Sequence, residues 1–251
     1  MIVAKLGRAV RSHDWLTALI EPVLLVMGIF LGFQLDRWND ERLDRVAANE
    51  FRIQLIADLE VERSDVSALI TYHESVREYA EIALTAWDQQ PLLEPEDLVV
   101  ALYQASNILP FTSARGAYDA LSANGLIDLI GDPGLRSRLA AYYGQATDQV
   151  FEEEKRYRRE IRGVMPVNVQ RLVRDTCINL STDTSISESF SDDCSLELDP
   201  DYLSEVLESI KSHPNMRNYL REGISRDSIF IYLMNAKLEF LDKLLKELRS
   251  V

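Results

Sequence analysis

The chain has 251 residues, 47% of them hydrophobic, and a formal net charge of −14. This hydrophobic fraction excludes a disordered chain and permits a sizeable core. Almost all of the negative charge lies after residue 35, and so acidic a domain repels phosphate backbones, which disfavours nucleic-acid binding. Glycine and proline are scarce, with 10 and 8 residues, which favours helices over a sheet with many turns.

The first element in the chain is an apolar run of 20 residues from Leu16 to Leu35, interrupted by a single charge. At 1.5 Å per residue this length crosses the hydrocarbon core of a membrane. Trp15 and Trp38 flank the run, roughly 34 Å of helix apart, and indole rings prefer the two membrane interfaces. We therefore predict a transmembrane helix over residues 15–38, with these two tryptophans as its interface anchors and membrane lipid as its surroundings.

This run has two other interpretations. A buried core helix of a soluble protein would need an apolar wall on all its sides. A cleavable signal peptide would need a small-x-small cleavage site after the run, and the sequence has none there. The run is therefore predicted to remain as a signal anchor.

The orientation of the anchor is less sharply defined by charge, because arginines and lysines occur on both sides of it in nearly equal number. A 14-residue tail before an apolar run is nevertheless typical of an uncleaved signal, which directs the downstream part of the chain across the membrane. We predict a cytoplasmic tail over residues 1–14 and an exported domain over residues 39–251.

The two cysteines, Cys177 and Cys194, bound a segment rich in serine, threonine and aspartate that has no helical periodicity. A disulfide between them would stabilise a loop of this size by roughly 3 kcal/mol in the chain-entropy model. The alternative is a pair of free thiols in a cytosolic protein. We predict the disulfide, closing a loop over residues 177–194.

Residues 43–87 contain neither glycine nor proline and carry an apolar stripe with a spacing of three and four residues. This pattern predicts one long helix, continuous with or close to the membrane helix. The stripe consists of Leu55, Leu59, Glu62, Val66, Leu69, His73, Val76, Ala80, Ala83 and Trp87.

Further helices are predicted from capping residues, prolines and apolar spacing over residues 94–109, 114–124, 132–161, 199–211 and 215–249. The third of these is expected to continue past residue 161, to be kinked or interrupted at Pro166 and to fade near residue 175. Residues 126–130 are expected to form an apolar link, and no segment shows the period of a strand. The predicted fold is all-α, an N-terminal transmembrane helix followed by an elongated antiparallel helical bundle.

The stretch IEPVLLVMGIFLGFQLDRWNDER resembles the anchor of a family of bacterial proteins of unknown function, in which an apolar helix runs into a Gln-x-x-x-Trp-Asn-Asp/Glu motif. Arg37 departs from the asparagine usual before the tryptophan. The stretch AYDALSANGLIDLIGDPGLRSRLAAYY is similar to the middle block of that family. The resemblance implies a single-pass protein of the inner membrane of a Gram-negative bacterium, with a helical periplasmic domain, and implies no activity. The matching positions in the anchor are Glu21, Gln34, Trp38, Asn39 and Asp40.

Within the predicted anchor, one row of residues has a 4-3-4-3 spacing along one side of the helix and includes a carboxylate and a G-x-x-x-G pair. Glycines four apart allow two helices to approach closely, so the row suggests a helix–helix interface and a homo-oligomer. The carboxylate could instead simply reach toward the nearby membrane interface. The row consists of Glu21, Leu25, Gly28, Gly32 and Leu35.

No pattern in the sequence predicts catalysis, a metal or a cofactor. The histidines His13, His73 and His213 form no metal-ligand pair, and no phosphate-binding loop or nucleophile elbow is present. His73 is expected to be a core histidine with satisfied hydrogen bonds. Asp58, Glu62 and Asp65 share one helical turn and could meet a cation, although such a group is more often a solvated acidic face. An enzyme is therefore not predicted.

The function predicted from these features is that of a membrane-anchored scaffold, which presents its helical bundle to another, unidentified envelope protein. The alternative is a small-molecule sensor that holds a ligand between its helices and acts through a partner, because a 14-residue tail leaves no room for an output module. A well-formed pocket would favour the sensor, and a flat apolar patch or a crossing of long helices the scaffold.

Overall fold

A computed structural model describes residues 15–88, 93–111, 113–144, 155–181, 187–191 and 194–250, with the backbone alone at 15–19, 181 and 187. Its main element is α2, Trp15–Asp88, a single helix of 74 residues that is about 110 Å long at 1.5 Å per residue. The predicted continuity between the apolar run and the helix over residues 43–87 is therefore confirmed. Pro22 lies in the second turn, where the helix still continues. The predicted tail over residues 1–14 lies outside the described residues.

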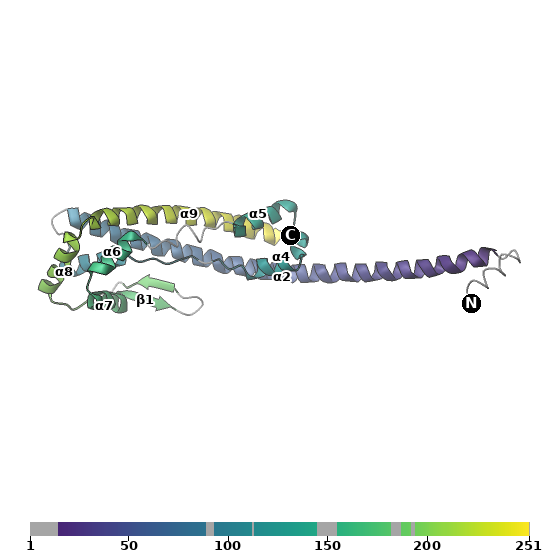
Figure 1. Cartoon of the computed structure of the whole chain (residues 1–251), viewed down its shortest axis with the longest axis horizontal. Helices are drawn as coiled ribbons and strands as arrows, with labels where there is room; N and C mark the ends of the chain where they lie inside the picture. Colours follow the sequence, from purple (N-terminus) through teal and green to yellow (C-terminus); the bar gives the residue numbers. More distant parts are fainter. Residues whose placement is uncertain are drawn as a thin grey trace.

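The second long helix is α9, Met216–Ser250, which runs antiparallel to the C-terminal part of α2 (Figure 1). Contacts at its two ends show this direction. Arg52 donates to the carbonyl oxygen of Leu248 at 2.7 Å, and Arg217 pairs with Asp88 at the far end of α2. The N-terminal part of α2 projects beyond this pair, and the C-terminus lies beside the point where α2 leaves the bundle (Figure 1).

Short elements cover the α2–α9 pair. At the end where α2 projects lie α4, Gly116–Ala123, the 3-10 helix η1, Leu126–Leu129, and α5, Pro133–Gly144 (Figure 1). The opposite end holds α6, Arg156–Val164, α7, Val167–Cys177, and α8, Pro200–Ser212. The remaining helix is α3, Pro95–Gln104, which has proline in its first turn as predicted.

Three expectations from the sequence are corrected. The helix predicted over residues 132–161 does not pass through Lys155, whose φ of −54° and ψ of 127° are extended. α3 ends at Gln104, five residues before its predicted end. Residues predicted to lack strands form an antiparallel hairpin of β1, Ile178–Ser181, and β2, Ser187–Phe190, with Ile178 opposite Phe190. Strands this short carry too few residues for their period of two to show in the sequence.

The core is divided into two clusters along the bundle. The base cluster, next to the projecting part of α2, contains Leu55, Leu59 and Val66 of α2 together with Leu241 and Leu248 of α9. The tip cluster, at the opposite end, contains Ala80 and Ala83 of α2 with residues of α3, α6, α7 and α8. The predicted α2 stripe from Leu55 to Ala83 is buried along its whole length, and Trp87 is half-buried, which confirms the stripe.

The fold class is all-α, as predicted, apart from the small hairpin. Within the part of the chain that the structure describes, no helix combines the length and the apolar character that a membrane crossing requires.

Candidate functional site

The projecting part of α2 exposes an unusual amount of apolar surface. Every side chain from Ile20 to Val46 is exposed. Eleven large apolar side chains between Ile20 and Leu35 have exposed fractions of 48% to 66%, and they occupy all sides of the helix. Exposed apolar surface of this extent marks a site of contact with a membrane or with another protein. This segment is therefore the first candidate functional site.

The row predicted as a helix–helix interface lies within this segment. Leu25 and Leu35 are 66% and 65% exposed, and a Cβ atom added at Gly28 or Gly32 would have no neighbour within 4 Å. The row is therefore open on the helix surface, where a second helix could approach. Of the two predicted interface anchors, Trp38 is 63% exposed, whereas the side chain of Trp15 lies outside the described residues.

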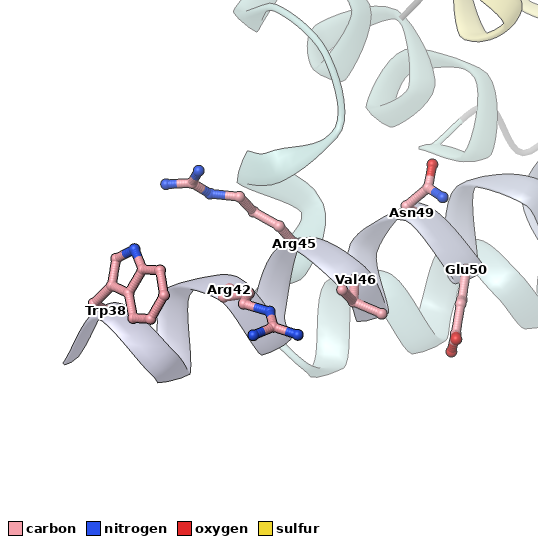
Figure 2. A pocket seen from close by; sticks show the side chains of 6 residues that line it. All are labelled: Trp38, Arg42, Arg45, Val46, Asn49 and Glu50. Carbon is pink, nitrogen blue, oxygen red and sulfur yellow. The ribbon is translucent and has the colours of Figure 1, made fainter. Parts of the chain in front are cut away.

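Immediately after the apolar run, one face of α2 carries a surface depression (Figure 2). Arg45 and Trp38 extend to one edge of this face, Arg42 and Glu50 extend to the other, and Val46 lies between them (Figure 2). The depression belongs to one helix alone, because all its lining residues come from α2: Trp38, Arg42, Arg45, Val46, Asn49 and Glu50. Such a face suits a second helix better than a small ligand, which requires a concave site.

A second candidate site is a layer of buried polar side chains between the base and tip clusters. His73 of α2, Asp227 of α9 and Lys155 are 3%, 1% and 5% exposed. The Lys155 ammonium donates to both Asp227 oxygens at 2.6 and 2.8 Å and to the carbonyl oxygen of Asn107 at 3.1 Å. His73 Nδ1 lies 3.0 Å from Asp227 Oδ1, and its Nε2 lies 3.1 Å from the carbonyl oxygen of Leu109. These bonds confirm His73 as a core histidine with satisfied hydrogen bonds.

The charges of this layer are balanced by direct contact. Burial lowers the pKa of Lys155, and the adjacent Asp227 carboxylate opposes this shift by favouring the ammonium form. All three ammonium hydrogens have an acceptor, so the geometry matches a protonated Lys155. A small cavity of about 50 Å³ borders the layer. Its size fits a few water molecules and is far below the roughly 300 Å³ of small-ligand sites.

The polar layer continues into the tip of the bundle through a chain of hydrogen bonds. The Asn107 side chain donates to Gln104 Oε1 at 2.6 Å, and Gln104 donates to the carbonyl oxygen of Cys177 at 3.2 Å. Cys177 and Cys194 form a disulfide with their Cα atoms 4.7 Å apart, in agreement with the predicted pair. The disulfide joins the end of α7 to the segment after β2, so it closes the hairpin at its base.

A third polar group lies inside the base cluster. Glu62 is 2% exposed and accepts from Ser113 at 2.9 and 3.0 Å and from the Tyr142 hydroxyl. The Lys237 ammonium lies 3.5 Å from Glu62 and 4.4 Å from the centre of the Tyr142 ring. Asp58, one turn away, accepts from the backbone N–H of Ala117 at 3.2 Å. Of the acidic turn that could meet a cation, Glu62 and Asp58 are therefore engaged by protein donors.

Among the residues that the structure describes, no three His, Cys, Asp or Glu side chains are arranged to hold a metal ion. Sequence reasoning did not find the contribution of Lys155 and Asp227. A usable signal existed for Asp227, because Met216, Leu220, Gly223, Asp227 and Phe230 form a 4-3-4-3 row that is buried on α9. Lys155 had no comparable signal, since it comes after three glutamates in a segment typical of a solvated helix face.

No family model matches the chain, and no curated protein or solved structure is similar to it.

Proposed function

We propose that the protein is a single-pass, membrane-anchored scaffold of the bacterial envelope, which holds a rigid helical bundle outside the cytoplasm for another envelope protein. In this proposal residues 15–38 cross the inner membrane with the N-terminus in the cytoplasm. The proposed span begins at Trp15, five residues before Ile20, the first residue of α2 whose side chain is described. The proposal includes no enzymatic activity.

The observation that carries the proposal is the apolar surface of α2 from Ile20 to Leu35. Burying one such side chain is worth about 2 kcal/mol, so burying eleven is worth on the order of 20 kcal/mol. A groove on a partner protein would cover one side of the helix. Lipid covers all sides, which matches an apolar surface that extends around the whole circumference.

The continuity of α2 supports the scaffold role. A bend between the anchor and the bundle would need a break in the helical hydrogen bonds, and α2 continues as one helix without proline from Val23 to Asp88. The bundle would therefore stand upright on its anchor, with its tip about 80 Å of helix beyond Leu35. The sensor alternative is not favoured at the buried polar layer, because the cavity beside that layer holds about 50 Å³.

The test is membrane fractionation of cells that express the full chain, followed by extraction at alkaline pH. The chain should stay in the membrane pellet. Val26→Arg combined with Phe30→Arg should release it, because each arginine at the centre of a span costs about 3 kcal/mol. Ile53→Arg combined with Val61→Arg is the matched control, since both residues are exposed on α2 beyond the proposed span and should leave the chain in the pellet. A wild-type chain found in the soluble fraction would refute the proposal.

The side of the membrane is tested separately. A reporter that is active only outside the cytoplasm, fused after Val251, should be active. A reporter signal that is restricted to the cytoplasm would refute the exported orientation while leaving the anchor intact.

A further inference from the structure

The part of α2 between the apolar run and the bundle has one face that the bundle leaves uncovered. This stalk face is centred on Val46 and Ile53, which are 52% and 56% exposed. Ala48 and Leu55, on the opposite side of the same turns, are 3% and 0% exposed and pack into the base cluster. The stalk face consists of Trp38, Arg42, Leu43, Arg45, Val46, Asn49, Glu50 and Ile53.

The stalk face continues a row that begins in the apolar run. The spacing of Arg42, Val46, Asn49 and Ile53 is 4-3-4. Asn39 lies four residues after Leu35 and three before Arg42, so the alternation of four and three continues across the junction. The whole row therefore extends from Glu21 to Ile53 with a repeat of 3.5 residues. The seam of a two-stranded coiled coil has this repeat, and the large apolar residues of the row are Leu25, Leu35, Val46 and Ile53.

The side chains that flank the seam are complementary to those of an identical parallel helix. In a parallel pair, the residue directly before every second seam position, here before Asn39 and Val46, lies opposite the residue five positions later in the other chain. Arg45 would then face Glu50 of the second copy, and Trp38 would face Leu43, so a charge meets its opposite and an apolar side chain meets another. Figure 2 shows Arg45 and Glu50 at opposite edges of the face with Val46 between them, as this pairing requires.

The polar residues of the seam are compatible with the pairing. An asparagine at an a position of a seam fixes the register of two helices, and Asn39 occupies such a position, whereas Asn49 is a further polar residue of the seam. The Arg42 guanidinium turns to the edge that Glu50 occupies, so its charge leaves the centre of the face (Figure 2). The contact between Arg45 and Glu41 spans 3.6 Å with side chains that are 72% and 60% exposed, and such an exposed pair is weak enough to be exchanged.

We propose that a second copy of this chain packs in parallel along the stalk face, with Arg45 of each copy paired with Glu50 of the other. The proposal rests on the membrane anchor proposed above, because two copies inserted in one membrane present their α2 helices side by side and in the same direction. The two-fold axis then lies along the seam, and each copy contributes the same residues.

The first test is disulfide crosslinking of the full chain. Val46→Cys places a thiol at the centre of the seam, whereas Asp44→Cys places one two residues earlier, on the far side of the same exposed turn. The two native cysteines are bonded to each other, so the new thiol is the one available for crosslinking among the described residues. Val46→Cys should yield covalent dimers at least five-fold more efficiently than Asp44→Cys. Equal yields at the two positions would overturn the proposal.

The second test exchanges the charges in the Val46→Cys background. Arg45→Glu alone and Glu50→Arg alone place like charges opposite each other, and each should lower the dimer yield several-fold. The double variant restores the pairing with its signs reversed and should recover the yield. A double variant that crosslinks no better than the two single variants would overturn the pairing of Arg45 with Glu50. Both side chains are exposed, so the melting temperature should be unchanged.

Crosslinking is measured in the membrane and the soluble fraction of the same cells, so that the two proposals fail separately. A chain absent from the membrane pellet contradicts the anchor, whatever its crosslinking. A chain that is retained in the pellet with equal yields at positions 44 and 46 contradicts the pairing and leaves the anchor standing.

Discussion

Residues 20–46 and 47–88 of α2 belong to one uninterrupted helix but meet opposite surroundings. In the first half every side chain is exposed, and apolar residues occur on all sides. The second half buries one stripe and exposes the rest. A helix is a common framework for both, because its backbone hydrogen bonds are internal and do not depend on what surrounds it. The distribution of apolar residues around the axis decides the surroundings that each half requires.

The two halves of α2 also differ in how their polar residues are accommodated. The second half carries polar residues on its buried stripe, and each of them has a partner from another element. Glu62 and His73 are buried because α9 and its neighbours supply Lys237 and Asp227. Glu21, in the first half, is exposed. The comparison therefore predicts that changes in the second half alter the stability of the bundle, and that changes in the first half alter its location.

The largest effect is expected from Asp227→Ala, which leaves Lys155 and His73 buried without their carboxylate. Removing one partner of a buried ion pair costs about 3–5 kcal/mol. Urea denaturation of the full chain in detergent, followed by circular dichroism, should show a loss of this size in the free energy of unfolding. Glu239→Ala, which removes an exposed i,i+4 pair with Lys243, is the control and should have little effect. If both variants unfold at the same urea concentration, the polar layer does not hold the bundle together.

A pair of identical substitutions tests the two halves of α2 directly. Leu59 is 0% exposed and Leu24 is 61% exposed. Leu59→Ala creates a cavity in the base cluster and should cost about 2–5 kcal/mol of stability. Leu24→Ala should leave the unfolding transition of the bundle in place, because the bundle does not contact this residue. A similar loss from both would mean that the first half of α2 is packed against protein.

Replacement of Cys177 and Cys194 by serine should lower the free energy of unfolding by roughly 3 kcal/mol, the value for a loop of this size. The loss should be confined to the tip, so hydrogen exchange should increase in α7 and the hairpin more than in α4. Alkylation of the unreduced wild-type protein should label neither cysteine. Quantitative labelling of both would show that the bond does not form in the cell.

The smallest effect concerns acid. Asp132 accepts from the backbone N–H of Leu135 at 2.8 Å, and this bond lowers the pKa of its carboxyl below the ordinary 3.8. The carboxylate therefore adds stability that is fully present above pH 3.8 and is lost as the pH falls through its folded pKa. Asp132→Asn should reduce the acid sensitivity of the bundle slightly, as measured by melting temperature between pH 5 and about pH 2. An unchanged dependence of the melting temperature on pH would mean that the hydrogen bond between Asp132 and Leu135 does not contribute to stability.

Periodicity predicted the long elements well. The stripe from Leu55 to Ala83 gave the position and the buried face of α2, since nine positions with one spacing leave little ambiguity. A proline at the first helical position gave the starts of α3 and α8, and at α8 the N-cap residue Asp199 also accepts from the N–H of Asp201 at 2.8 Å. The Cys177–Cys194 disulfide could be predicted because the sequence contains two cysteines, so each had one possible partner within the chain.

The features that the sequence did not reveal depend on contacts between distant segments. Lys155 leaves the helical conformation where its side chain reaches Asp227, 72 residues away, and no local pattern reports this bond. The hairpin of β1 and β2 is closed at its base by the disulfide and by the bond from Ser191 N–H to the Cys177 carbonyl oxygen, contacts that no local pattern reports. The row from Glu21 to Leu35 was proposed from the sequence as a helix–helix interface and stays a prediction, whereas the exposed face around Val46 and Ile53 could be defined only once the position of the bundle was known.

The return of α9 to the base of the bundle, where Arg52 holds the Leu248 carbonyl oxygen, has a mechanical consequence. A pull between the anchor and the tip loads α2 and α9 in shear, so that all their contacts must slide together before the bundle extends. A pull between the anchor and the C-terminus acts at one end of the same pair and opens its contacts one after another. We therefore expect the bundle to resist tension applied at its tip at far higher force than it resists peeling from the end of α9.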